Sequence, residues 1–269
     1  MRATAVRRTV LTASAVALAL MVTACGGGDG DGDGDSKAKA GSDTAAAKPA
    51  AKALTAAELE KAVVTTADVK GHEVKKPGKD DVFAPGAVKT GKAECEPVAL
   101  VMSALPAGEP AASVQRVVTE KHTGAEGGPS VEDLAGMTEE EAEQAMLDSL
   151  DLTKTMTSLW SYEGDGARET LAALREAGQK CAGGFPVTVA GDEQRVTEVA
   201  EDESGAGEEA VAWTVTSEAK DGPVETKVVV FRQGSTLAGF SAFNIASVAR
   251  GESFEAPTAL IEAQEAKLG

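Results

Sequence analysis

The sequence predicts an α+β domain over residues 54–269, in which helices pack against an antiparallel sheet. Three observations support this class: short capped helices come first, strands with two-residue alternation follow from about Gln194, and a last helix begins at Pro257. Strands that follow one another through Gly-containing hairpins, without a helix between them, are typical of an antiparallel meander. We find no internal repeat. The roughly 215 residues suit one domain of ordinary size or two small ones, and we predict one.

The first helix is predicted from its start signal. Thr55 and Glu58 have the spacing of a capping box, in which each side chain bonds to the backbone of the other residue. The helix is expected to end near Thr65. Residues 66–94 are rich in Lys, Gly, Pro and Asp, which predicts loops with one short strand.

The middle of the chain mixes helices and strands. Thr138 and Glu141 form a second predicted capping box. Leu171, Leu174 and Cys181 recur at helical spacing and therefore share one face of a helix. In order, we predict a helix at 95–105, a strand at 114–120, a Gly-rich loop at 121–136, a helix at 138–150, a strand at 155–162 and a helix at 165–182.

The C-terminal third has the period of strands. Strands are predicted around Val196 and at 209–218, 224–232 and 235–244, with a final helix at 257–268. Val211, Trp213 and Val215 alternate with smaller or polar residues, as one buried face requires. Residues 228–231 are apolar at every position, so this strand is expected to be central and covered on both faces.

The N-terminus has the pattern of an export signal. Arg2, Arg7 and Arg8 precede an apolar run at 10–22, and small residues lead to Cys25. The apolar run is shorter than the roughly 20 residues of a membrane-spanning helix. A Cys directly after small residues is typical of a bacterial lipobox, which predicts cleavage after residue 24 and acylation of Cys25. The alternative is an ordinary signal peptide or an uncleaved anchor.

Residues 25–53 are predicted to be a disordered tether, because they contain Gly, Asp, Ser, Ala and Lys and almost no large apolar side chain. Asp29, Asp31 and Asp33 resemble the start of a calcium-binding EF-hand loop. That loop needs a bidentate Glu at its twelfth position, where this chain has Ala40. A solvated spacer is therefore the preferred interpretation.

Charge and cysteine content limit the function further. The chain has a net charge of −17, which cleavage of residues 1–24, with three Arg and no acid, would change to −20. Such a chain would repel nucleic acid and an anionic membrane surface. If Cys25 carries lipid, Cys95 and Cys181 remain, and two Cys in an exported protein predict one disulfide. The alternative is a pair of buried thiols.

No motif for catalysis or metal binding is recognised. His72 and His122 are the only histidines, and neither has the companion ligands that a zinc site needs. Glu120 and His122 point the same way on a strand but do not make a site. We therefore predict no catalytic residue, metal or cofactor. Trp160 and Trp213 are expected to be core residues, and a ligand groove is the alternative.

Five segments carry a resemblance to a known family: ADVKGHEV from Ala67, CEPVALVMSAL from Cys95, SYEGDGARETLAALREAGQKC from Ser161, EAVAWTV from Glu209 and VVVFRQGSTLAGFSAFN from Val228. Together they resemble exported actinobacterial lipoproteins related to the extracellular sensor domain of the mycobacterial serine/threonine kinase PknH. The resemblance implies a twisted antiparallel sheet with helices against it, forming a cleft. The family domain carries two disulfides, whereas here only Cys95 and Cys181 are available.

The sequence thus favours a lipid-anchored, non-catalytic binding or sensor-like module on the outer face of the cytoplasmic membrane. Its partners would be the membrane, through the lipid, and a small ligand or envelope component, with no nucleic acid. The ligand-binding residues stay unknown from the sequence. Two alternatives remain: an accessory or structural envelope lipoprotein that acts through protein contacts, and an enzyme without recognised motifs.

Overall fold

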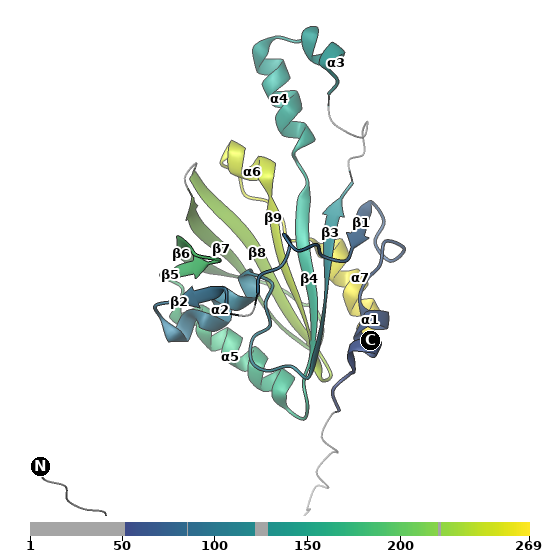
Figure 1. The fold of residues 1–269 in the computed structure, drawn as a ribbon, viewed down its shortest axis with the longest axis vertical. Helices are drawn as coiled ribbons and strands as arrows, with labels where there is room; N and C mark the ends of the chain where they lie inside the picture. Colours follow the sequence, from purple (N-terminus) through teal and green to yellow (C-terminus); the bar gives the residue numbers. More distant parts are fainter. Residues whose placement is uncertain (1–51, 85, 122–128, 220–221) are drawn as a thin grey trace, which may run out of the picture. The chain divides into compact units, whose positions relative to one another are not determined.

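The computed structural model describes residues 52–84, 86–121, 129–219 and 222–269. The predicted signal peptide, Cys25 and His122 lie outside these ranges. The described residues form nine strands, seven α-helices and one 3-10 helix (Figure 1). The strands are β1 (His72–Lys75), β2 (Val88–Thr90), β3 (Ala112–Glu120), β4 (Thr153–Ser161), β5 (Phe185–Val189), β6 (Asp192–Asp202), β7 (Glu209–Ala219), β8 (Gly222–Gln233) and β9 (Thr236–Asn244). The helices are α1 (Ala56–Ala62), η1 (Ala93–Cys95), α2 (Glu96–Met102), α3 (Val131–Ala135), α4 (Glu139–Ser149), α5 (Gly166–Lys180), α6 (Ile245–Arg250) and α7 (Thr258–Leu268).

All nine strands form one antiparallel sheet in the order β1-β3-β4-β9-β8-β7-β6-β5-β2. The predicted α+β class, with helices packed against an antiparallel sheet, is therefore confirmed. Strands β5 to β9 follow one another in the sheet as they do in the chain, which is the predicted C-terminal meander. Strand β8 is the fifth of the nine, so the prediction of a central strand at 228–231 is also confirmed.

A hydrophobic core lies on each face of the sheet, as the side chains of β8 show. Val228 and Val230 belong to the core that α2 and α5 cover, and Val229 and Phe231 belong to the core that α1 and α7 cover. Successive side chains of a strand point to opposite faces, so a run of four apolar residues feeds both cores. Figure 1 shows α1 and α7 beside each other, away from α2 and α5.

Both predicted capping boxes are present in the structure. The Thr55 hydroxyl accepts a hydrogen bond from the Glu58 N–H, and Glu58 accepts one from the Thr55 N–H. Thr138 and Glu141 cap α4 in the same way. Asp165 is the N-cap residue of α5, but its side chain makes no capping hydrogen bond.

Five segments differ from the sequence-based expectation. The predicted loop at 121–136 contains α3, and the region 66–94 holds two short strands instead of one. Strand β5 and helix α6 were not predicted, and β6 is much longer than the strand expected around Val196. Within the described residues, no helix is long and apolar enough to cross a membrane.

Candidate functional site

A pocket of about 320 Å³ lies on the α7 face of the sheet. One wall is the loop that joins β6 to β7, the opposite wall is α7, and β7 and β8 form the floor. The floor is apolar and buried: Ala212 is 3%, Val229 4% and Ile261 7% exposed. Ala206 closes the loop side.

The β6–β7 loop is held in place at Gly207. Its N–H donates a hydrogen bond to the Glu265 carboxylate on α7 (3.0 Å), which ties the two walls together. Gly207 has a φ of +64°, and a Cβ at this position would come 2.6 Å from the Arg232 carbonyl oxygen. Only glycine satisfies both the conformation and the close approach. The next residue, Glu208, donates its N–H to the same carbonyl (2.9 Å).

Four carboxylates surround the pocket. Asp202 and Glu203 lie at the end of β6, and Glu262 and Glu265 lie on α7. Glu203 and Glu262 are exposed, so they line the mouth and not the floor. Carboxylates are hydrogen-bond acceptors and carry negative charge, so the rim favours a ligand with donors or positive charge.

Lys227 is the only cation among the residues that line the pocket. Its side chain is 12% exposed and pairs with Glu225 (3.3 Å). The ammonium group also donates to the Thr214 hydroxyl (2.8 Å) and lies 5.7 Å from the centre of the Phe254 ring. Thr214 in turn donates to Asp202 (2.7 Å). Lys227 therefore connects the floor strands to the acidic rim.

The pocket combines an apolar floor with polar groups at its rim, and its lining contains no His or Cys. Across the described residues, no group of three or more His, Cys, Asp or Glu is arranged to hold a metal ion. An apolar floor with a few polar groups at the rim is what small-molecule sites present.

A second concavity, of about 680 Å³, lies where β2, β5 and β6 meet. Most of its lining is exposed, including Lys89, Glu193, Arg195 and Glu218, with Val187 as the buried element. It lacks a second wall like α7, so a ligand there would lose less contact with water. We therefore prefer the pocket beneath the β6–β7 loop.

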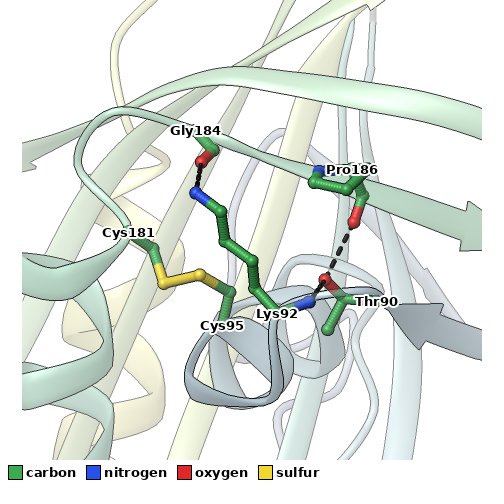
Figure 2. The surroundings of a disulfide bond; sticks show 6 residues. All are labelled: Thr90, Lys92, Cys95, Cys181, Gly184 and Pro186. Atoms are coloured by element: carbon green, nitrogen blue, oxygen red, sulfur yellow. Dashed lines mark hydrogen bonds between the residues drawn. A yellow bond between two sulfur atoms is a disulfide. The ribbon is translucent and has the colours of Figure 1, made fainter.

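The structure joins Cys95 and Cys181 in a disulfide with a Cα–Cα distance of 5.8 Å. Both residues are fully buried, on the face of the sheet opposite the pocket. As Figure 2 shows, the bond fastens η1 to the end of α5, and Lys92 adds a hydrogen bond to the Gly184 carbonyl (2.9 Å). The disulfide supports the fold and does not line the pocket.

None of the other residues singled out from the sequence places its side chain in the pocket. Trp213 lines the pocket only with its backbone, because its ring belongs to the core on the opposite face. His72 lies on the edge strand β1, with its Nε2 3.9 Å from Glu120. Trp160 and Trp213 are buried in the core on the α5 face, at 1% and 3% exposure. The Asp residues of the predicted tether lie outside the described residues.

The residues that form the pocket were not recognised in the sequence. The loop between β6 and β7 forms one wall of the pocket, and no motif in the sequence marks it. One usable signal was Lys227, a single cation directly before the apolar run of a central strand. A Lys side chain that is only 12% exposed is rare without a partner, and this one has several.

No family model and no curated protein matches the chain. Among solved structures, it is similar to the crystal structure of the extracellular domain of PknH from Mycobacterium tuberculosis. The TM-score is 0.48 and the sequence identity 14%, over 81% of this chain and 97% of that chain. No activity, ligand or partner of this chain follows from that likeness.

Proposed function

We propose that the chain is a lipid-anchored, non-catalytic binding module on the outer face of the cytoplasmic membrane. Its ligand site is the pocket between the β6–β7 loop and α7. The observation that carries the binding role is the combination of a buried apolar floor, an acidic rim and the hydrogen-bonded Lys227 in one pocket.

The location rests on two features of different kinds. The N-terminal residues have the pattern of an export signal that ends at Cys25. The Cys95–Cys181 disulfide supports an oxidising compartment, because such bonds are rare in the cytosol. Acyl chains on Cys25 would hold the acidic protein on the membrane without a basic patch.

The ligand would be a small molecule or envelope component with an apolar body and hydrogen-bond donors or positive charge. The apolar part would lie on Ala212, Val229 and Ile261, and the donors would face the four carboxylates. An anionic ligand is disfavoured, because one cation faces four acids at this pocket.

Native mass spectrometry of the full chain, purified gently from its natural host, tests the binding role. We expect extra mass that disappears on denaturation. Ala206→Phe should fill the pocket and remove this mass, whereas Thr188→Phe, placed in the second concavity, should keep it. A bare wild-type protein, or extra mass that Ala206→Phe retains, would contradict the proposed site.

The anchor is tested on the same preparations. Covalent acyl chains would stay on the protein after denaturation, so their mass is separable from that of a bound ligand. Cys25→Ser should remove the acyl mass and move the protein from the membrane fraction to the soluble fraction. Unchanged membrane association of Cys25→Ser would argue for an uncleaved anchor.

A further inference from the structure

The two helices between β3 and β4 form an arm, defined as residues 129–151. Figure 1 shows α3 and α4 beyond the ends of β3 and β4. Neither helix has a buried residue. Each begins with a complete capping box, from Ser130 to Asp133 and from Thr138 to Glu141. The two helices of the arm are thus stabilised by their capping boxes and not by side chains buried in a core.

Exposed apolar side chains gather at the arm. Of the seven large apolar side chains exposed among the described residues, four belong to it: Val131 (84%), Met137 (38%), Met146 (45%) and Leu150 (42%). The other three, Val82, Phe83 and Ile245, lie in segments joined to the base of the arm. Ile245 begins α6, which contacts α4, and Val82 and Phe83 follow Asp81, which pairs with Lys154 at the start of β4. A concentration of exposed apolar side chains is typical of an interaction surface.

The arm is also strongly acidic. Residues 129–151 contain eight Asp and Glu and no Lys, Arg or His. Asp148 and Asp151 pair with Arg250 of α6. The carboxylates of Asp133 and Glu141 accept hydrogen bonds at the helix ends, which holds their pKa values below the usual range. The other four, Glu132, Glu139, Glu140 and Glu143, are exposed.

This combination of apolar and acidic groups limits the kinds of partner that the arm can bind. A second copy of the chain would bring the same carboxylates together, and like charges that are desolvated at an interface are costly. An anionic membrane surface would be repelled for the same reason. A basic protein segment with an apolar face meets both features, since its Lys or Arg would pair with the carboxylates.

We propose that the arm is a docking surface for a Lys/Arg-rich amphipathic segment of a partner protein. Met146 on α4 and Leu150, the C-cap residue of that helix, are four residues apart and therefore neighbours, and they contact the apolar face of the partner. The flexible thioethers of Met137 and Met146 adapt to a surface of varied shape. Glu139, Glu140 and Glu143 hold the basic side chains. This surface is separate from the pocket, which has no lining residue on the arm.

The test uses the full chain in phosphatidylcholine nanodiscs and a fluorescent synthetic helix of Lys and Leu with one apolar face. Empty nanodiscs serve as the blank, and a shuffled peptide of equal composition lacks the apolar face. We expect anisotropy to report binding of the amphipathic peptide only. Met146→Ser with Leu150→Ser should weaken this binding by about tenfold or more, as loss of an apolar anchor does. Because neither arm helix has a buried residue, thermal unfolding of this variant should match the wild type.

A matched pair of charge variants separates the arm from the general acidity of the protein. Glu140→Gln with Glu143→Gln should lower the affinity for the peptide and reduce the salt dependence of binding. Glu198→Gln with Glu201→Gln removes the same charge from exposed positions of β6 and should change the affinity by less than about twofold.

Four results would overturn the proposal. Equal binding of the shuffled peptide, or equal effects of the two charge variants, would mean diffuse attraction to an acidic protein. Self-association that Met146→Ser with Leu150→Ser abolishes would assign the arm to a second copy. Binding to phosphatidylglycerol vesicles that the same variant abolishes would assign it to a membrane. None of these results depends on whether the pocket holds a ligand.

Discussion

Gly178 of α5 lies directly on the indole ring of Trp213 in β7: a Cβ at residue 178 would come 2.6 Å from the indole Nε1. Gly178→Ala would gain up to about 1 kcal/mol of helix propensity. Overpacking of a buried ring costs about 1–3 kcal/mol, so we expect the steric cost to exceed the gain. Urea unfolding should show a net loss of about 1–2 kcal/mol.

The cause of that loss is checked in a second background. Trp213→Phe replaces the indole by a smaller ring and should reduce the penalty of Gly178→Ala, which a double-mutant cycle would measure as coupling. If Gly178→Ala stabilises the protein in both backgrounds, α5 can move away from the sheet and the contact is not specific.

The Cys95–Cys181 bond closes a loop with a sequence separation of 86 residues on the α5 face. Cys95→Ala with Cys181→Ala should lower the free energy of unfolding by about 2–5 kcal/mol, because the unfolded chain gains freedom. Adding a thiol reductant should lower the stability of the wild type and leave the variant unchanged. A wild type that does not respond to reductant under unfolding conditions would contradict a stabilising role.

Gln264 joins α7 to the end of α1 and is fully buried. Its side chain accepts a hydrogen bond from the Val64 N–H (3.0 Å) and donates one to the Ala62 carbonyl (2.9 Å). Gln264→Leu would leave both backbone groups without these partners, at a cost of about 2–4 kcal/mol. Ala266→Leu, at an exposed position of the same helix, is the control and should change stability little. Thermal unfolding of both variants provides the measurement.

The elements that the sequence predicted best are those with local signals. The capping boxes at Thr55 and Thr138 depend on residues three positions apart, and both are present. Helix α3 was missed because it has only five residues, and its capping box ends on Asp133 and not on Glu or Gln. The run of four apolar residues in β8 predicts burial on both faces of the strand, whichever residue points to which face. This strand was assigned correctly.

Strand β6 shows why the remainder of the sheet was harder to predict. A β-bulge falls between Val196 and Glu198, and the buried residues of the strand are Val196 and Val199, three positions apart. An extra residue in a strand shifts the alternation of its faces, so the two-residue period is lost. The pocket depends on this strand and on α7, which are far apart in the chain. Their contact forms only in the tertiary structure and has no local sequence signal.

Asp68 makes the free energy of unfolding depend on pH. Its carboxylate accepts hydrogen bonds from Lys267 and from Thr65, and these lower its pKa to about 2. The unfolded value is about 3.9, so the contribution is present above that pH and is lost as pH falls toward 2. Since the side chain is partly exposed, we expect roughly 1 kcal/mol.

Asp68→Asn isolates this contribution from that of the other carboxylates. The wild type should be more stable than the variant at pH 6, and the difference should shrink between pH 4 and pH 2. Urea unfolding at each pH gives the comparison. A difference that stays constant over this range would mean that the charge of Asp68 does not act in the folded state.

Arg250 fixes the end of the arm to α6, the helix that follows β9. It contacts Asp148 at 2.6 Å and Asp151 at 2.7 Å, and these carboxylates raise its own pKa. Since α4 buries no residue, this link is a main restraint on its position. Arg250→Ala should therefore speed hydrogen exchange in α4 severalfold and leave the exchange of β8 unchanged, because local opening does not require global unfolding. Arg168→Ala, which removes an exposed pair with Asp165 at the start of α5, is the matched control and should leave α4 unaffected. Faster exchange throughout the sheet of Arg250→Ala would instead make the arm part of the cooperative fold.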